Sequence, residues 1–268
     1  MTNWTRRNFI KTTGVAGGTL AAIPSLSLNS CKPKSMKQIT IEATNSNFER
    51  EPLIRPFGFK GGYMSEIWQT AAWMKSTSEI EKVGLCTQNV LWSDAKVFAS
   101  FSESGGNSMM YGMTEYALKI LESKTFSSPV ALLDEILDEV YAYGQKITDN
   151  VDLRKTFALN ALVGVDNAAW MLFAAENGIT SFDEMIPEEY RPALSHHHET
   201  VASIPLMAYS IPVSEIKQAA DDGYFFMKIK IGQPGTQEEM LEKDKTRLSE
   251  IHKAIGHYTT EHSKDGKL

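Results

Sequence analysis

The sequence predicts an α+β domain followed by an incomplete α/β domain, with the boundary near residue 200. Two observations support this prediction. In the first part of the chain, apolar residues alternate as in a strand and then recur at helical spacing over long stretches. From Ser203 the predicted order changes to strand, helix, strand, helix. Alternating β and α units imply a parallel sheet, and two such units leave the edges and faces of that sheet partly uncovered.

The composition is that of an ordinary globular protein. The chain has 268 residues, a formal net charge of -6 and 42% hydrophobic residues, which is enough to form a core in one or two domains. Lysine and arginine do not cluster after the amino terminus, so the sequence gives no basis for nucleic-acid binding. No stretch of about eighteen uncharged apolar residues occurs in the body of the chain, and no membrane-spanning helix is expected there.

Residues 1–31 are predicted to be an export signal. Arg6 and Arg7 are followed by Phe9 and then by an uncharged, weakly apolar stretch from 12 to 28. A basic start, an apolar middle and a small-residue exit is the order of a secretory signal. The paired arginines resemble the twin-arginine signal, which carries folded proteins across the bacterial inner membrane. We therefore expect a periplasmic or lipid-anchored protein.

Cys31 has two interpretations. Leu28–Cys31 resembles a lipoprotein box, in which an acylated Cys31 would attach the protein to a membrane, whereas cleavage nearby would leave an ordinary thiol. Cys86 is the only other cysteine. No disulfide framework is therefore expected, and Cys86 is predicted to be a small core residue.

The α+β domain, at 32–200, is predicted to begin with a strand and a helix. Ile39, Ile41 and Ala43 alternate as in a strand, and Tyr63–Met74 has the spacing of an amphipathic helix. Between them, Pro56–Gly62 contains three glycines and two aromatic residues. This composition is typical of a loop that covers a site, or of a surface turn.

Three helices are predicted between Met109 and Asn177, after a loop at Ser102–Ser108. They are broken at Ser127-Ser128-Pro129 and near Asp149-Asn150. One apolar stripe, which should pack into the core, comprises Leu132, Leu133, Ile136, Leu137, Val140 and Tyr141. Small residues lie along one side of Asn160–Trp170, which predicts close packing against a neighbouring element.

A polar linker is predicted between the two domains. After Gly178 comes a short run, Phe182–Ile186, and then a segment with two prolines and His196-His197-His198. Three adjacent histidines cannot all face one metal in regular structure, and no other ligand cluster accompanies them. A solvated linker is therefore a better interpretation than a zinc site.

The α/β part, at 201–268, is predicted to contain two βα units. The strands are Ile204–Tyr209 and Tyr224–Ile231, and the helix Val213–Asp222 between them ends at Gly223. A second helix is predicted from Thr236, where Thr236 and Glu239 can form a capping box. Its apolar face comprises Leu241, Leu248, Ile251 and Ile255.

Lys228 and Lys230 are the candidate catalytic residues. Successive side chains of a strand point to opposite faces, so the two lysines share one face while Met227 and Ile229 take the other. A lysine near a second ammonium in a partly desolvated site loses part of its preference for the charged form, and such an amine can act as a base. Alternatively, both lysines extend from an edge strand into water.

Lys228-Ile229-Lys230, with Leu162–Trp170 upstream, resembles the mandelate racemase and muconate-lactonizing branch of the enolase superfamily. The resemblance implies an α+β capping domain followed by the first βα units of a modified, TIM-like (β/α) barrel. It implies removal of a proton next to the carboxylate of a small molecule by Lys230, with Mg²⁺ holding the enediolate, a known pattern of that superfamily. Lys228 would tune Lys230 or contact the substrate carboxylate. Whether the complete protein is a homo-oligomer stays open.

The resemblance also implies three carboxylate metal ligands on later barrel strands, which we expect beyond Leu268. Asp265 is expected in a turn and not at a strand end. We therefore expect a truncated racemase, epimerase or lactonizing enzyme that is inactive alone. Two alternatives stay open: a non-catalytic periplasmic lipoprotein or binding module, and a lyase that uses a lysine as Schiff-base nucleophile.

Overall fold

The computed structural model describes residues 36–59 and 62–268. The predicted signal residues Arg6 and Arg7, and Cys31, lie outside the described residues.

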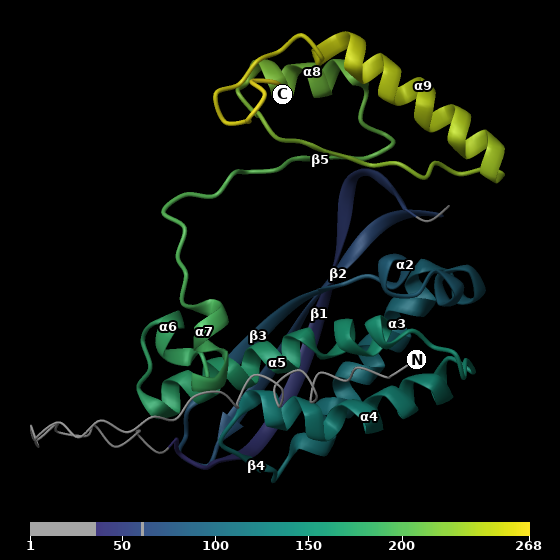
Figure 1. The fold of residues 1–268 in the computed structure, drawn as a ribbon. Helices are drawn as coiled ribbons and strands as arrows, with labels where there is room; N and C mark the ends of the chain where they lie inside the picture. Colours follow the sequence, from purple (N-terminus) through teal and green to yellow (C-terminus); the bar gives the residue numbers. More distant parts are fainter. Residues whose placement is uncertain (1–35, 60–61) are drawn as a thin grey trace, which may run out of the picture. The chain divides into compact units, whose positions relative to one another are not determined.

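An antiparallel sheet forms one layer of the first domain (Figure 1). Its strands are β1 (Ile39–Phe59), β2 (Gly62–Ser76), β3 (Glu81–Gln88) and β4 (Thr125–Phe126), in the order β3-β2-β1-β4. Ile39 and Ile41 are buried and Ala43 is half-buried, so the predicted first strand is confirmed. The strand is much longer than the alternation indicated.

The helix predicted at Tyr63–Met74 is wrong, because this segment belongs to strand β2. Its buried side chains follow the period of a strand: Met64, Trp68, Thr70, Ala72 and Met74. β2 lies between β1 and β3 and pairs with both of them. Hydrogen bonds along both edges and burial of every second side chain stabilise the strand more than the helical spacing stabilises a helix.

β1 and β2 form a long hairpin. The register shifts between Pro52 and Phe57, and beyond that shift residues 57–59 pair with residues 62–64. The segment predicted as a loop at Pro56–Gly62 is therefore a continuation of the hairpin over its described residues. We call Arg55–Phe59 the hairpin tip.

Helices form the second layer of this domain, and Figure 1 shows them on one side of the sheet. They are α2 (Val90–Ser93), α3 (Ala95–Leu121), α4 (Pro129–Ile147) and α5 (Lys155–Asn177). The predicted breaks are confirmed. The Ser128 side chain caps α4 by accepting a hydrogen bond from the Ala131 N–H, and Gly178 ends α5 in a left-handed conformation with φ 64°.

The loop predicted at Ser102–Ser108 is wrong, because this segment is helical apart from a kink at its first residue. Ser102 has φ 67° and ψ 173°, and its hydroxyl accepts a hydrogen bond from the Gly105 N–H at 3.3 Å. Ser102 therefore caps the second part of α3. Gly106 tolerates no side chain, since a Cβ there would lie 2.4 Å from Cγ2 of Val90. Gly106 therefore serves close packing and not a loop.

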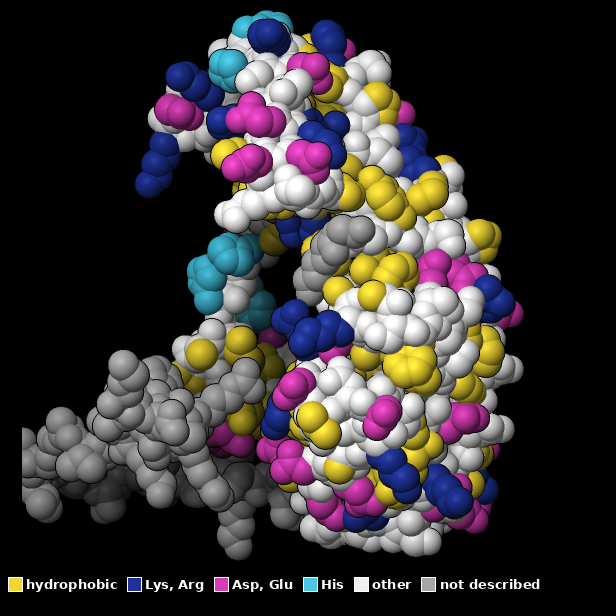
Figure 2. Space-filling model, turned by 90° about the vertical axis from the view of Figure 1, so that its right-hand side faces the viewer, with side chains coloured by type: hydrophobic (Ala, Val, Ile, Leu, Met, Phe, Trp, Pro, Cys, Tyr) yellow, Lys and Arg dark blue, Asp and Glu magenta, His cyan; other side chains and the backbone are white. Residues whose placement is uncertain are grey.

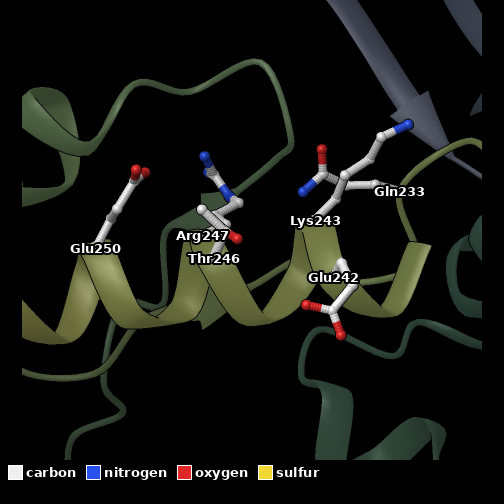
Figure 3. Close-up of a pocket in the computed structure, with 6 residues that line it drawn as sticks. All are labelled: Gln233, Glu242, Lys243, Thr246, Arg247 and Glu250. Atoms are coloured by element: carbon white, nitrogen blue, oxygen red, sulfur yellow. The ribbon is translucent and has the colours of Figure 1, made fainter. Parts of the chain in front are cut away.

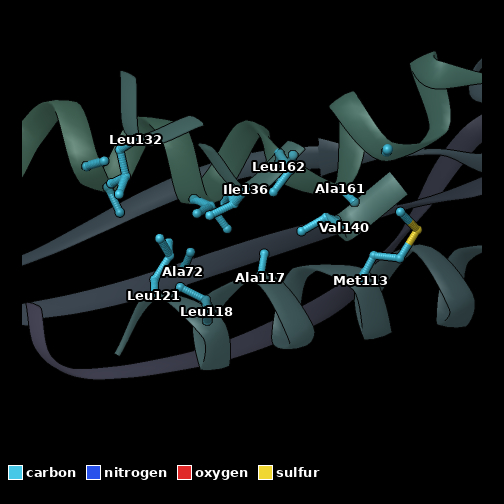
Figure 4. Packing of buried hydrophobic residues seen from close by; sticks show 14 of the residues in the cluster. Ala72, Met113, Ala117, Leu118, Leu121, Leu132, Ile136, Val140, Ala161 and Leu162 are labelled. Atoms are coloured by element: carbon cyan, nitrogen blue, oxygen red, sulfur yellow. The ribbon is translucent and has the colours of Figure 1, made fainter. Parts of the chain in front are cut away.

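The core lies between the helices and the sheet. In Figure 4, side chains of α3, α4 and α5 meet those of β2, including Met113, Ile136, Leu162 and Ala72. The apolar stripe predicted on α4 packs into this core, with Leu132, Ile136 and Val140 buried and the other members partly buried. Among the described residues α5 alone is long and apolar enough to cross a membrane, and it is the central core helix.

α5 lies very close to β3. A Cβ on Gly84 would lie 2.0 Å from the carbonyl oxygen of Gly164, so the small residues predicted to allow close packing do so here. β3 is an edge strand of this sheet. Asn167 and Asn160 of α5 donate their side-chain amides to the carbonyl oxygens of Leu85 and Thr87, at 2.9 and 3.1 Å.

A mostly exposed segment follows the first domain. It contains α6 (Phe182–Met185), a 3-10 turn η1 (Glu188–Tyr190) and α7 (Arg191–Leu194). His196, His197 and His198 are exposed, and His197 Nε2 lies 3.3 Å from a carboxylate oxygen of Asp183. The described residues contain no group of three or more His, Cys, Asp or Glu side chains suited to a metal.

A second, two-stranded parallel sheet lies in the α/β part. Its elements are β5 (Leu206–Met207), α8 (Val213–Asp221), β6 (Lys228–Ile229) and α9 (Gln237–Ile255). The order of elements and the parallel pairing match the prediction, but both strands are shorter than predicted. Neither strand has a second neighbouring strand among the described residues. The two strands pair with each other over only two residues each.

The core of the α/β part is small. Met207, Ile216 and Ile251 are buried, and Met227, Ile229 and Ile255 pack partly against them. The predicted capping box of α9 is present. Its predicted apolar face is only partly covered, since Leu241 is 53% exposed and Leu248 is 43% exposed.

Candidate functional site

Lys228 is the first residue of β6, and Lys230 directly follows its last residue. Their backbone N–H groups donate to the carbonyl oxygens of Pro205 and Met207, both at 3.0 Å, and fix the parallel register with β5. Met227 and Ile229 turn toward the small core, as the alternation predicts. Lys228 is exposed, whereas Lys230 is half-buried. The two lysines therefore differ in their access to water.

The Lys230 ammonium contacts an aromatic ring of the hairpin tip. Its Nζ lies 3.9 Å from the centre of the Phe59 ring, in the geometry of a cation–π interaction. Phe59 comes from the glycine-rich segment that the sequence suggested as a covering loop. The glycines and aromatic residues of that segment suggested that it could cover a site, but the sequence offered no reason to choose Phe59 over its neighbours.

Tyr209 and Asp244 hold the backbone that follows β6. The Tyr209 hydroxyl lies 2.7 Å from the carbonyl oxygen of Ile231 and 2.8 Å from that of Gly232. Burial raises the pKa of Tyr209, and the negative charge of Asp244 adds to this effect. Asp244, in α9, accepts a hydrogen bond from the Gly232 N–H at 2.7 Å. The sequence did not identify Tyr209, and it suggested no role for Asp244.

The hairpin tip is fixed to the α/β part by polar contacts. Arg55 donates two parallel hydrogen bonds of 3.1 Å to the carboxylate of Glu215, in the first turn of α8. The Ser210 hydroxyl donates to the carbonyl oxygen of Pro56 at 3.2 Å. A Cβ on Gly58 would lie 2.6 Å from Cδ2 of Tyr209, so the backbone of the tip lies directly against this ring.

The upstream part of the motif, Leu162–Trp170, lies in α5 and serves packing. Leu162, Val165 and Ala169 are buried in the core of the first domain. Burial raises the pKa of the Asp166 carboxyl, which the Trp170 side chain partly offsets. Cys86 is buried as predicted, and burial raises the pKa of its thiol.

The described residues do not fit a magnesium site. Mg²⁺ prefers several oxygen ligands in octahedral order, and the described residues provide no cluster of three such side chains. Asp265 lies in a turn, where its carboxylate accepts hydrogen bonds from the Lys267 N–H and the Ser263 hydroxyl. These bonds lower its pKa. The Asp244 carboxylate is likewise engaged by backbone N–H groups.

A hollow of about 410 Å³ on α9 contains neither lysine of the pair (Figure 3). Its lining comprises Gln233, Glu242, Lys243, Thr246, Arg247 and Glu250. Arg247 donates to the carbonyl oxygens of Ala208 and Ile211, and Lys243 donates to that of Pro234. The basic groups of this hollow therefore hold the neighbouring loops.

Acidic and basic side chains are interspersed on the face shown in Figure 2, with hydrophobic side chains between them. That face has no continuous basic patch of the kind that binds nucleic acid.

No family model matches the sequence, and no curated protein matches it. Solved structures do match. A dipeptide epimerase from Enterococcus faecalis, complexed with Mg and the dipeptide L-Leu-L-Tyr, is 13% identical with a TM-score of 0.52, over 81% of this chain and 51% of that one. An enolase from Bradyrhizobium, complexed with magnesium and mandelic acid, is 13% identical with a TM-score of 0.51, over 82% and 52% of the two chains.

A mandelate racemase/muconate lactonizing protein from Herpetosiphon aurantiacus is also 13% identical, with a TM-score of 0.51, over 81% of this chain and 51% of that one. The chain thus spans about half the length of each of these structures. At this identity the likeness concerns the fold. The chain therefore shares the fold of these three structures, and in this chain that fold consists of an α+β capping domain followed by part of a β/α barrel.

Proposed function

We propose that this chain carries the lysine base of a site that removes a proton next to the carboxylate of a small molecule. The observation that carries the proposal is the position of Lys230, half-buried at the carboxyl end of a parallel strand, with Lys228 two residues earlier. Barrel enzymes keep their catalytic groups at this end of their strands. The solved structures with the same fold include an epimerase.

The proposed step uses Lys230 as the free amine. The amine takes the proton from the carbon next to the carboxylate and becomes an ammonium, while the electron pair of the C–H bond moves into the carboxylate to give an enediolate. A water molecule donates a proton to the opposite face of that carbon and gives the epimer, and the Lys230 ammonium returns its proton to the hydroxide that remains. The Lys228 ammonium, on the same face of the strand, offers a positive charge to the carboxylate oxygens.

Exchange of the α-proton for solvent deuterium tests the proposal. The chain is incubated in deuterium oxide with mandelate or L-Leu-L-Tyr, with and without Mg²⁺, and the loss of the α-proton signal is followed by NMR. Because a general base contributes about 10²- to 10⁴-fold, Lys230→Ala should reduce the exchange rate by about that factor. Lys264→Ala is the control, since Lys264 lies in the carboxyl-terminal turn.

Undiminished exchange in Lys230→Ala would contradict the proposal. An exchange rate in the native chain no higher than in buffer would agree with the expectation that the chain is inactive alone. Binding of the carboxylate without exchange would favour the binding module instead. Reduction with borohydride in the presence of a carbonyl compound, with a mass increase at Lys230, would favour the Schiff-base lyase.

We also propose export through the twin-arginine signal and attachment to a membrane through Cys31. The support is the sequence of residues 1–31 alone. The double variant Arg6→Lys and Arg7→Lys should retain the protein in the cytoplasm of a bacterial host, as cell fractionation would show. Cys31→Ala should release an exported protein from the membrane fraction, and an unchanged distribution in either variant would contradict that part.

A further inference from the structure

A hollow of about 350 Å³ lies on the face of the first sheet that points away from the helices, which we call the open face. Ala72 and Met74 of β2 are buried in the core. Because successive side chains of a strand point to opposite faces, Ala71 and Trp73 point to the open face. The described residues that line the hollow are Asn45, Ser46, Asn47, Ala71, Trp73 and Val83.

Trp73 provides an aromatic ring in this hollow. Its indole N–H donates a hydrogen bond to the Glu81 carboxylate at 3.3 Å, and this bond fixes one edge of the ring. Val83, which is 43% exposed, lies opposite Trp73 on β3, and Asn45 lies opposite Trp73 on β1. Ala71, two residues earlier on the same face, has only a methyl group and leaves space beside the ring. The hollow therefore combines an aromatic ring with two aliphatic side chains.

Asn45 and Asn47 add hydrogen-bond donors. The Asn45 side-chain oxygen accepts from the Ser46 N–H, and the Asn47 side-chain oxygen accepts from the Phe48 N–H, both at 2.8 Å. Because the oxygens are engaged, each amide presents its NH₂ group, which has no hydrogen-bond partner among the described residues. Residues two apart along a strand are separated by about 6.5 Å. The two donors can therefore reach two different oxygen atoms of one ligand.

The charges around the hollow favour a neutral ligand. None of the described residues that line it is charged. Glu81, next to the ring, and Glu49, further along the same face of β1, would repel an anion. Lys75, further along β2, is paired with Glu42 and Glu79 at 3.1 and 2.6 Å. The amide NH₂ groups are donors and offer no electron pair to a cation.

We propose that this hollow binds a neutral sugar ring in its pyranose form. The C–H bonds on one face of a pyranose are attracted to the electron-rich face of an indole, and its oxygens accept hydrogen bonds from amides. Ligand pockets measure about 300–1,000 Å³, so a hollow at the lower end of this range suits a single ring. The inference goes beyond the proposed function, because neither Lys228 nor Lys230 lines the hollow.

Saturation-transfer NMR of the protein with methyl β-D-glucopyranoside tests the proposal. In this sugar the hydrogens on carbons 1, 3 and 5 lie on one face of the ring, and those on carbons 2 and 4 lie on the other face. If one face stacks on the indole, saturation of the protein should pass more strongly to the hydrogens of that face. Titration with the glucoside then gives the dissociation constant for each variant.

Trp73→Leu removes the ring and should weaken binding of the glucoside by roughly 2- to 13-fold, the factor that corresponds to an aromatic contact. Trp73→Phe keeps an aromatic face and should retain most of the affinity. Asn45→Ala should weaken binding by roughly 2- to 13-fold, as the loss of one hydrogen bond does. The controls are Trp92→Leu, in α2, and Gln69→Ala, on the open face but outside the lining. Both should leave the affinity unchanged, with the fold of every variant checked by circular dichroism.

Two further ligands test the neutral charge and the sugar class. Methyl β-D-glucuronoside carries a carboxylate in place of the hydroxymethyl group, and benzyl alcohol offers an aromatic ring with one hydroxyl. Both should bind more weakly than the glucoside. The inference would be overturned by the absence of saturation transfer to the glucoside, by undiminished binding in Trp73→Leu, or by tighter binding of the glucuronoside or of benzyl alcohol.

Discussion

Gly84 and Gly164 define the closest approach between strand and helix in the first domain. A Cβ on Gly84 would lie 2.0 Å from the Gly164 carbonyl oxygen and 2.3 Å from the Ala168 nitrogen. Both of these are backbone atoms within a helix, so they cannot turn aside as the end of a flexible side chain would. The spacing of β3 and α5 thus depends on the absence of one methyl group.

Gly84→Ala should therefore destabilise the protein by about 1–3 kcal/mol or more, as overpacking does. Gly112→Ala is the matched control, because no heavy atom lies within 4 Å of its Cβ position in α3. Alanine is the better helix former, so this variant should gain about 0.5–1 kcal/mol. Urea unfolding measures both changes. Equal effects of the two variants would contradict the packing explanation.

Glu176 is a buried carboxylate, 7% exposed, that ties the end of α5 to the end of β2. Burial raises the pKa of Glu176, but hydrogen bonds from the Ser76 and Ser78 hydroxyls and the charge of Lys37 outweigh burial. The net result is a pKa below the ordinary value of 4.5. The folded state therefore binds this proton less readily than the unfolded state does.

The stability that comes from this lowered pKa is present above about pH 4.5 and is lost as the pH falls through the pKa of the folded state. Glu176→Gln removes this titration, so its free energy of unfolding should fall less steeply than that of the native protein between about pH 5 and pH 3. Urea unfolding across this range measures the difference. Glu188→Gln changes an exposed position, and its free energy of unfolding should fall with pH as steeply as that of the native protein. If the free energy of unfolding fell equally steeply in all three proteins, Glu176 would not be the group responsible.

At the scale of elements, strand β2 shows what the sequence could not predict. Its helix-forming residues and spacing favoured a helix, whereas its conformation depends on β1 and β3 on either side. The helix at Ser102–Ser108 was missed for a similar reason, because Gly106, which suggested a loop, packs against Val90 of α2. By contrast, the ends of α4, α5 and α9 were predictable, since local caps determine them.

The capping box of α9 gives a prediction at this scale. The Thr236 hydroxyl accepts a hydrogen bond from the Glu239 N–H, and the Glu239 carboxylate accepts one from the Thr236 N–H. Thr236→Ala should therefore cost about 1 kcal/mol. Thr246→Ala, in the middle of the same helix, should be neutral or slightly stabilising. Thermal unfolding compares the two, and a larger loss in Thr246→Ala would contradict this account.

At the scale of the whole molecule, burial is distributed unevenly. The buried cluster of the first domain draws on its sheet and on α3, α4 and α5, whereas that of the α/β part consists of Met207, Ile216 and Ile251. Regions with few buried contacts open locally at lower free energy than regions with many. The α/β part should therefore open more often than the first domain.

Hydrogen exchange followed by mass spectrometry tests this difference. Amides of α8 and α9 should exchange well before those of α5. Ile251→Ala should destabilise the local packing by about 2–5 kcal/mol and accelerate amide exchange in the α/β part alone. Ile136→Ala should accelerate amide exchange in the first domain. Uniform protection across the described residues would show that they open as one cooperative unit.

The candidate site was predictable in part. Lys228 and Lys230 stood out because charged residues alternate with apolar ones in a short strand, a pattern that needs no tertiary information. The contact of Lys230 with Phe59 depends on how the hairpin tip meets the strand end. No local sequence pattern predicts the contact between the hairpin tip and the strand end. The same is true of the hydrogen bonds from Tyr209 to the backbone after β6.

The two asparagines of α5 have an effect beyond the packing of helix on strand. By occupying the carbonyl oxygens of Leu85 and Thr87, they remove acceptors that a strand from another molecule would need. The first sheet is therefore protected from growing by strand addition at β3. Self-association of the purified protein at high concentration should consequently proceed through other surfaces, and replacing Asn160 and Asn167 should make β3 a starting point for aggregation.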